Sequence, residues 1–409
     1  MKLLYILLSA TLLVACNTQT TAPAVNYLEN YVSDVTYLAH DSLEGREVGT
    51  QGEVIAATYI AERMKKIGLI PKGDDSCYFQ VFTRKMKAHP HDTLMLGDEI
   101  EGRNVLGFID NNSKSTIVIG AHYDHLGYGE EGSLSDSAGQ IHNGADDNAS
   151  GVAAMLGLAS KFKNVKLKSN VLFIAFTGEE KGLWGSNYFV KNSTLSNSEM
   201  NFMINMDMVG RLDSNNRLAI YGIGTSPVFK PILDSCNTWG FKSKFDSSGV
   251  GPSDHTSFYL ADVPVLHFFT GQHKDYHKPT DDTEFINFKG IVKVADYIES
   301  VVLSLNKFDT IPFTKTKETS NKARAFKVTL GVIPDYLYDG AGMRIDGIKQ
   351  ERPAQIAGIE KGDVVLKMGG FEVKNMTDYM NCLSKFEKGI TVIVQVKRGE
   401  SVLNKKVVF

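Results

Sequence analysis

The sequence has no surplus of basic residues. Its 409 residues include 44 Lys and Arg against 47 Asp and Glu, which gives a net charge of -3. Nucleic-acid-binding proteins usually present a basic face, so this balance offers no electrostatic argument for such a partner. Internal repeats and low-complexity tracts are also missing. Hydrophobic (43%) and charged (22%) contents are ordinary for a globular protein. The length is sufficient for two domains.

Cysteine is scarce, with four residues in the chain. Cys77, Cys236 and Cys382 are odd in number, lie far apart and lack metal-ligand spacing. They therefore predict neither a disulfide framework nor a thiolate metal site. We expect these three side chains to be small buried residues.

The apolar run at the N-terminus, MKLLYILLSATLLVAC, is too short for a membrane-spanning helix and has the layout of an export signal. Its last four residues, LVAC, resemble a bacterial lipoprotein box, in which the cysteine becomes the lipidated first residue. We expect a signal peptide over residues 1–16, lipidation of Cys16 and a polar tether over residues 17–26. The protein would then be exported and anchored to a bacterial membrane, on the periplasmic or outer-surface side. An ordinary secretory signal is the alternative.

Strand-like apolar runs recur through the middle of the chain and alternate in several places with helical stretches. Residues 27–69 have a largely helical pattern, and helices are also expected over 151–162 and around 230–239. This alternation predicts an α/β fold with a mixed, mostly parallel central sheet flanked by helices. The strand-like runs are NVLGFI, STIVIGAHYDH, NVLFIAFTGEE, MNFMINMDMVG, RLAIYGIG and VPVLHFFTG.

Two domains are expected. Residues 27–307 hold the alternating strands and helices. Residues 308–325 are polar and rich in Lys and Thr, which is typical of a linker. Residues 326–409 contain many glycines and short β-like runs, which indicate a second, small and β-rich domain.

Ionisable residues follow several of the predicted strands, at the edge where open α/β sheets bind ligands. The stretch IHNGADDNASGVAAM also places Asp146 beside Asp147 where a loop becomes a helix, although like charges repel. For that stretch alone, helix capping is the favoured explanation. The full set of such residues is His122, Asp124, Asp147, Glu179, Glu180, Asp207 and His277.

Apart from Asp124, this set places four carboxylates and two imidazoles at one edge of a sheet, and they need compensating positive charge. Two divalent ions supply about four charges, and zinc accepts both kinds of ligand. Asp147, at a loop–helix junction, suits a bridging ligand. The pair Glu179–Glu180 lets one carboxylate bind metal while its neighbour takes a proton from the bridging water. Asp124 is placed to orient the His122 imidazole.

The blocks GAHYDH, NGADDNASG, TGEEKGLWGS, NMDMVG and DYHKPTDD, in this order, resemble the co-catalytic zinc aminopeptidase family. That family also contains glutamate carboxypeptidases and glutaminyl cyclases. The likeness covers most of residues 34–305 and includes LAHDSLEGREVGTQGEVIAATYIAERMKKIGLIP. It implies a zinc-exopeptidase fold and two zinc ions per chain, although other divalent ions would also suit these ligands.

Carried over by position, the resemblance implies that His122 and Asp207 complete one zinc site and that Glu180 and His277 complete the other. Asp147 would bridge the two ions, and Glu179 would be the general base.

The resemblance assigns further residues around the ions. Asp281 matches an acid that supports the ligands, and Asp254, in GPSDHTSF, lies in another family block. Tyr276 would line the pocket for the first side chain of the substrate, although plain packing also explains it. His125 and His142 either touch the substrate or fill loops.

The segment RPAQIAGIEKGDVVLKMGGFEV is similar to the bacterial PDZ signature, and the likeness covers nearly all of residues 326–409. In PDZ domains a glycine-containing loop captures a C-terminal carboxylate and the peptide extends the sheet. Leu330, Gly331 and Val332 are the best candidates for that loop. A module kept only for packing is the alternative, because the following DYLYDGAGMRI is an insertion.

These observations predict an exported aminopeptidase that acts on peptides, with a possible C-terminal peptide ligand for its PDZ domain and a lipid anchor as its membrane contact. A carboxypeptidase or a one-zinc glutaminyl cyclase of the same family is the nearest alternative. A catalytically inactive binding protein is the alternative from a different class.

Overall fold

A computed structural model describes residues 27–85, 98–135, 137, 139–193, 195–316, 328–335, 338, 340–348, 351–374 and 376–409. The predicted signal peptide, Cys16 and the tether lie outside the described residues, as does the second half of the predicted linker. Among the residues that are described, no helix is long and apolar enough to cross a membrane.

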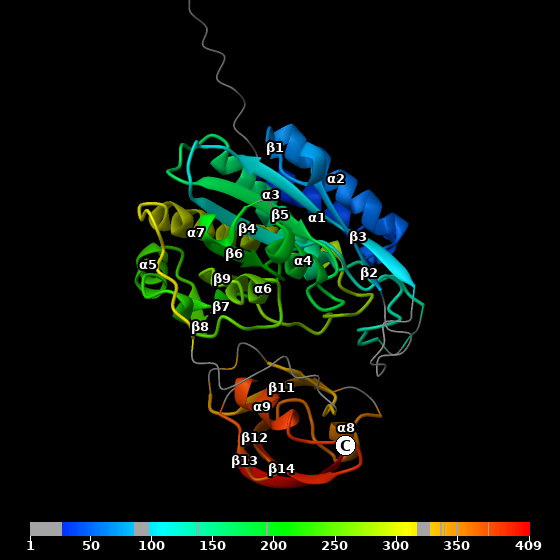
Figure 1. The fold of residues 1–409 in the computed structure, drawn as a ribbon. Helices are drawn as coiled ribbons and strands as arrows, with labels where there is room; N and C mark the ends of the chain where they lie inside the picture. Colours follow the sequence, from blue (N-terminus) through cyan, green and yellow to red (C-terminus); the bar gives the residue numbers. More distant parts are fainter. Residues whose placement is uncertain are drawn as a thin grey trace, which may run out of the picture.

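The larger domain is built on one mixed sheet with the strand order β1-β3-β5-β4-β6-β9-β7-β8, and β2 pairs with β3 (Figure 1). The four central strands β5, β4, β6 and β9 are parallel to one another, while β1, β2 and β3 add antiparallel pairings at one side and β7 pairs antiparallel with β9. This confirms the predicted sheet. The strands are β1 (Ile70–Pro71), β2 (Phe79–Lys85), β3 (Glu99–Ile109), β4 (Thr116–His122), β5 (Asn170–Phe176), β6 (Met200–Met206), β7 (Arg217–Tyr221), β8 (Lys242–Phe245) and β9 (Val265–Phe269).

Helices cover both faces of this sheet, and every residue of β4, β5 and β6 is buried. Alternate side chains of these strands enter two separate cores, as continuous apolar runs in parallel sheets require. One core packs against α1, α2, α3, α5 and α7, and the other against α4 and α6. The helices are α1 (Tyr27–Leu38), α2 (Gln51–Ile67), α3 (Gly151–Phe162), α4 (Trp184–Asn192), α5 (Phe229–Cys236), α6 (His255–Tyr259) and α7 (Phe288–Leu305).

The first part of the predicted linker packs against the larger domain. Ile311 is 2% exposed, and its N–H donates to Asn201 Oδ1 (2.7 Å). Thr314 N–H donates to the Thr225 carbonyl (2.8 Å), and Thr316 Oγ1 donates to the Tyr259 hydroxyl (2.9 Å). The chain therefore stays attached to the larger domain as far as residue 316.

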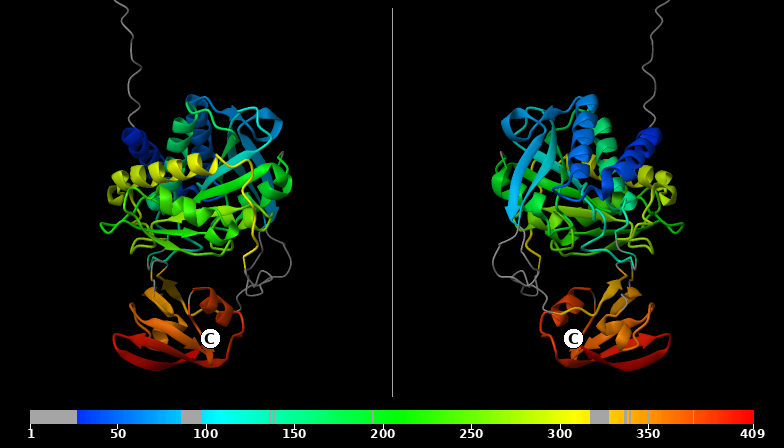
Figure 2. Two further views of the ribbon diagram at one scale, coloured as in Figure 1. Left: turned by 90° about the vertical axis from the view of Figure 1, so that its left-hand side faces the viewer. Right: turned by 90° about the vertical axis from the view of Figure 1, so that its right-hand side faces the viewer.

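The C-terminal domain is a separate β-rich body with its own apolar core (Figure 2). Its sheet has the order β10-β11-β12-β14-β15, with β13 paired to β12, and all its pairings are antiparallel. Cys382 is buried in this core and Cys236 in the larger domain, but Cys77 is exposed, so the expectation of burial was wrong for Cys77. The elements are β10 (Val332–Pro334), β11 (Met343–Ile348), α8 (Pro353–Ile356), β12 (Val364–Met368), β13 (Phe371–Glu372), α9 (Met376–Leu383), β14 (Thr391–Arg398) and β15 (Ser401–Val408).

Candidate metal centre

The carboxyl ends of the parallel strands meet around one cavity that opens to solvent. β4 ends at His122, while Glu179 and Glu180 follow β5 and Asp207 follows β6 directly. Asp147 enters from the turn before α3, and His277 from the loop after β9. The lining residues are His122, Asp147, Glu179, Glu180, Asp207, Met208, Tyr221, Pro252, His267, Phe269, Gln272, Tyr276 and His277.

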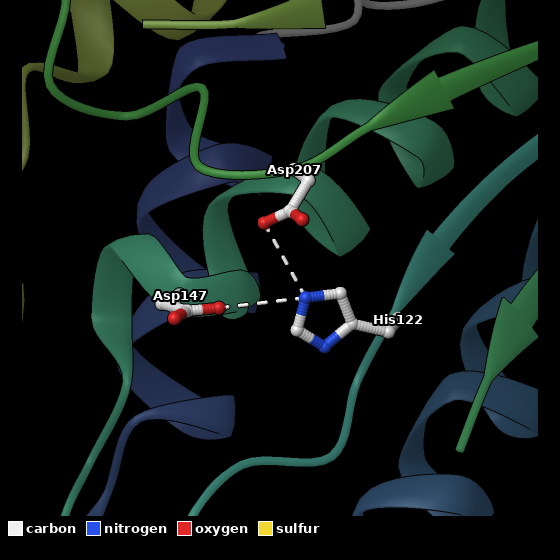
Figure 3. A group of neighbouring side chains, drawn as sticks. All are labelled: His122, Asp147 and Asp207. Carbon is white, nitrogen blue, oxygen red and sulfur yellow. Dashed lines mark ion pairs between the residues drawn. The ribbon is translucent and has the colours of Figure 1, made fainter. Parts of the chain in front are cut away.

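Two groups of donor atoms share the Asp147 carboxylate. His122 Nε2 lies 3.4 Å from Asp147 Oδ1 and 3.3 Å from Asp207 Oδ1 (Figure 3). His277 Nε2 lies 3.2 Å from Asp147 Oδ2 and 3.3 Å from Glu180 Oε2. Each oxygen of Asp147 thus faces a different imidazole and a different second carboxylate.

These separations fit a divalent metal ion between the donors. Tetrahedral zinc with bonds of about 2.0–2.1 Å keeps its ligand atoms about 3.3–3.4 Å apart. The four nitrogen–oxygen separations in the two groups, 3.2–3.4 Å, match that spacing closely. The donor set of imidazole and carboxylate is also one that zinc accepts.

His125 lies beside the second group without lining the cavity. Its Nδ1 is 2.8 Å from Glu180 Oε1, and His125, Asp147 and Glu180 also form a close donor group. However, Nδ1 is 4.0 Å from Asp147 Oδ2, whereas His277 Nε2 lies at nearly equal distances from both carboxylates. We therefore interpret His125 as a hydrogen-bond donor that orients Glu180. Sequence reasoning left His125 as a substrate contact or loop filler; its position directly after Asp124 was the available signal.

Asp124 is fully buried behind the cavity and supports three predicted site residues. Its Oδ1 accepts a hydrogen bond from Glu179 N (3.1 Å), and its Oδ2 accepts one from Glu180 N (3.4 Å). His122 Nδ1 lies 3.2 Å from the Asp124 carbonyl oxygen and 3.7 Å from its Oδ1. Asp124 therefore fixes the turn of the paired glutamates as well as the imidazole that the sequence indicated.

Asp281 and Asp146 hold the backbone that carries Asp147. Asp281 Oδ2 accepts hydrogen bonds from both Asp146 N (2.9 Å) and Asp147 N (3.0 Å). Asp146 itself does not line the cavity: its Oδ1 accepts from Gly210 N (2.7 Å) and its Oδ2 lies 3.1 Å from His273 Nε2. The two adjacent aspartates thus serve different partners. Neither Asp146 nor His273 was assigned a role from the sequence, because their contacts join segments far apart in the chain.

The site carries more negative charge than its own groups neutralise. Burial alone would lower the pKa of His122, but Asp207 and Glu179 raise it well above its usual value. Burial also acts to lower the pKa of His277, yet Glu180 and Asp147 raise it to about 9. Burial also raises the pKa of Glu179 well above the ordinary value. A divalent cation between these groups would supply positive charge to the site.

Asp254 and Tyr276 occupy different surroundings. Asp254 is fully buried outside the cavity, and burial raises its pKa to about 7, with Asp124 and Asp207 adding to the rise and His122 opposing it. Tyr276 lines the cavity and stacks on His277, with ring centroids 3.8 Å apart. His142 lies outside the cavity lining, with Nε2 2.8 Å from Ser133 Oγ.

The loop of the C-terminal domain that is predicted to bind a carboxylate packs against the start of α8. Leu330 is fully buried, and its carbonyl accepts from Ala354 N (2.9 Å). Gly331 has a φ of +73°, and a Cβ there would lie 2.2 Å from Arg352 Cβ, so the position requires glycine. Val332 opens β10, which ends the order of strands in the sheet. This loop is far along the chain from every cavity residue and contributes nothing to the cavity lining.

Comparison with known proteins supports both halves of this description. Residues 104–302 match Peptidase family M28, and residues 315–408 match the PDZ domain. Aminopeptidase YwaD of Bacillus subtilis is 29% identical over 257 residues, covering 59% of this chain and 51% of that protein. A probable leucine aminopeptidase of Arthroderma otae is 29% identical over 44% of each chain. The chain thus spans about half the length of the curated relatives it matches.

Solved structures share the fold of the larger domain. A Zn-dependent exopeptidase from Parabacteroides distasonis has a TM-score of 0.55 and 18% identity, covering 68% of this chain and 97% of that one. Glutaminyl cyclase from Porphyromonas gingivalis has a TM-score of 0.55 and 17% identity over the same shares. At these identities the likeness shows the fold alone.

Proposed function

This chain is a member of peptidase family M28 with a C-terminal PDZ domain, and on that premise we propose that it is an aminopeptidase that removes N-terminal residues from peptides. We infer that it binds two zinc ions, one held by His122 and Asp207 and one by Glu180 and His277, with Asp147 between them. The observation that carries the proposal is that the two oxygens of Asp147 face these two donor pairs at 3.2–3.4 Å.

In the proposed mechanism Glu179 is the general base. When bound, zinc supplies Lewis-acid polarisation of the scissile carbonyl and of the attacking water. The Glu179 carboxylate, which lines the cavity, takes a proton from that water and returns it to the leaving amine. Asp124 holds the backbone N–H groups of Glu179 and Glu180, so the base and its neighbour keep separate tasks. The free amine of the substrate would lie near the carboxylates of Glu180 and Asp207.

The rest of the cavity favours an apolar first side chain. Met208, Phe269, Pro252 and the rings of Tyr221 and Tyr276 give it an apolar side, next to the polar side chains of His267 and Gln272. Apolar surface of this kind gains free energy when it excludes water from an aliphatic or aromatic side chain. Leucine-like or aromatic residues are therefore the proposed substrates.

The deciding experiment measures hydrolysis of aminoacyl substrates with different first residues, with and without a chelator, beside their N-acetylated forms. We expect chelator-sensitive cleavage of the free-amine substrates only. Equal cleavage of blocked and free substrates would contradict the aminopeptidase proposal. Zinc analysis separates the cyclase alternative, for which we expect about one ion per chain in place of two.

We further propose that the protein is exported and held at a bacterial membrane through Cys16, from the lipoprotein-like LVAC sequence. Replacing Cys16 by Ser should move the protein from the membrane fraction to the soluble fraction.

We also propose that the PDZ domain binds a C-terminal peptide at Leu330, Gly331 and Val332. Binding of free-carboxylate but not amidated peptides would test that.

A further inference from the structure

Arg46 is a buried arginine whose side chain contacts the backbone next to two of the proposed metal ligands. Only 1% of the surface of Arg46 is exposed to solvent. Within the described residues, its guanidinium donates hydrogen bonds to backbone carbonyls. Nε donates to Tyr123 O (2.7 Å), Nη2 to Gly144 O (3.0 Å), and Nη1 to Asn143 O (2.6 Å) and Leu38 O. No carboxylate forms an ion pair with it there, which is unusual for a buried cation.

Three of the four accepting carbonyls, those of Tyr123, Asn143 and Gly144, belong to the two segments that present proposed ligands, and the fourth is at the end of α1. Tyr123 lies between His122 and Asp124, and Gly144 lies three residues before Asp147. One planar guanidinium thus joins the end of β4 to the turn before α3. Arginine suits this task because its donors diverge in a rigid plane.

The backbone around Arg46 reinforces the same connection. Its carbonyl accepts from His125 N (3.4 Å), and the Gly45 carbonyl accepts from Gly127 N (3.2 Å). Gly45 has a φ of +72°, and a Cβ there would lie 2.5 Å from the Gly127 carbonyl oxygen. The turn therefore fits closely against the segment that follows His122.

We propose that Arg46 is a positioning residue of the metal centre, which fixes the backbones that carry His122 and Asp147 and places a permanent positive charge behind their carboxylate neighbours. The inference rests on the proposed function in that it takes these residues to be zinc ligands. Burial lowers the pKa of Arg46 to about 10, against the opposing influence of Asp124 and Asp147, so it stays charged at neutral pH.

Arg63 provides a matched control in the same N-terminal region. Its guanidinium binds the buried Asp34 carboxylate in a bidentate manner, through Nε (2.6 Å) and Nη2 (2.9 Å). Among the described residues, its side-chain hydrogen bonds reach Asp34 and no segment that carries a proposed ligand. Replacing Arg63 by Lys should disturb packing without disturbing the metal centre.

The first test compares Arg46→Lys and Arg63→Lys in the full chain. Lysine keeps the charge but offers at most three donors, without the planar arrangement. We expect zinc affinity, measured by competition with a chelator, to fall about 10–100-fold for Arg46→Lys, as for other residues that orient metal ligands. Arg63→Lys should lower the thermal midpoint and leave zinc affinity unchanged. Wild-type zinc affinity in a folded Arg46→Lys variant would overturn the proposal.

A second measurement needs no variant and holds even if Arg46→Lys does not fold. In metal-free wild-type protein, the amides of His125 and Gly127 should remain protected from hydrogen exchange, because they donate to the carbonyls of Arg46 and Gly45, and the proposal requires this turn to stay packed against the segment after His122 without zinc. Exchange as fast as in exposed loops would overturn the inference. Since neither measurement uses peptidase activity, a chain that binds zinc without aminopeptidase activity contradicts the proposed function and leaves Arg46 to be judged separately.

Discussion

Each of the two domains buries an acidic side chain beside an arginine, but the pKa values of the two acids shift in opposite directions. In the PDZ domain Arg398 grips Asp363 through Nε (2.7 Å) and Nη2 (2.8 Å), and although burial opposes it, the pKa of Asp363 is lowered. In the peptidase domain Arg103 Nε lies 3.4 Å from Glu53 Oε2, and burial raises the pKa of Glu53 to about 7 despite Tyr123 and Arg103.

The difference follows from how completely each carboxylate is satisfied. Asp363 has two charge-assisted hydrogen bonds from one planar fork, the strongest arrangement for such a pair. Glu53 accepts from the Tyr123 hydroxyl (2.5 Å) and from Arg103 N (3.3 Å), both through the same oxygen. The peptidase domain therefore tolerates buried acids that lack full compensation, and these gather near the proposed metal centre. The PDZ domain uses its buried acid for folding.

The largest expected effect separates acids held for chemistry from acids held for folding. Replacing Glu179 by Gln should lower kcat about 100–10,000-fold, the range for loss of a general base. Stability should stay close to that of the wild type, because glutamine keeps the shape of the side chain and the backbone N–H of residue 179 keeps its hydrogen bond to Asp124. Steady-state kinetics and thermal unfolding with zinc bound measure the two effects. Retained activity would show that Glu179 is not the base.

The next effect concerns the pH dependence of stability at Glu53. Its folded pKa of about 7 lies above the unfolded value of 4.5, so its contribution is fully present below about pH 4.5 and is lost as the pH rises through 7. Glu53→Gln, which resembles the protonated form, should lie within about 1 kcal/mol of the wild type near pH 5 and should exceed its stability at pH 8. The gain is up to about 3 kcal/mol, since each pKa unit is worth about 1.4 kcal/mol.

Chemical unfolding of both proteins at the two pH values provides the measurement. Groups that titrate equally in both proteins cancel in the difference. A stability difference that is the same at pH 5 and pH 8 would contradict the assignment and would bring Glu53 closer to Asp363 in behaviour.

A smaller effect is expected when the PDZ pair is broken. Asp363→Asn should destabilise that domain by about 1–2 kcal/mol, the range for a charge-assisted hydrogen bond, reduced because the Arg398 side chain is 32% exposed. This loss of stability should appear as a lower midpoint for unfolding of the PDZ domain, while aminoacyl hydrolysis remains at the wild-type rate. A parallel fall in hydrolysis would show that the two domains share stability.

The sequence could predict the sheet and the gathering of acids at its edge, because continuous apolar strands have a clear pattern and the carboxyl ends of parallel strands meet. It could not reveal Arg46, whose acceptor at Tyr123 lies 77 residues away. The sequence did not reveal the roles of His273 and Asp146 for the same reason, because their contacts also join segments far apart in the chain. The linker was expected from residue 308, since polar composition does not show that Ile311 and Thr316 find partners on a distant surface. Roles at the site depend on bound metal and remain predictions.

The smallest expected effect comes from removing the PDZ domain altogether. A chain that ends at residue 316 keeps every residue that lines the cavity, from His122 to His277. It also keeps Ile311, whose burial contributes about 1.5–3 kcal/mol to stability. We expect kcat/KM for short aminoacyl substrates to stay within about twofold of the full chain, because recognition of one residue needs only the cavity.

A chain that ends at residue 307 is the matched control and should be less stable, since it loses Ile311 and the hydrogen bonds of Thr314 and Thr316. If the longer truncation lost activity while remaining folded, the PDZ domain would be part of the catalytic unit, and the contrast between a domain for chemistry and a domain kept apart from it would fail.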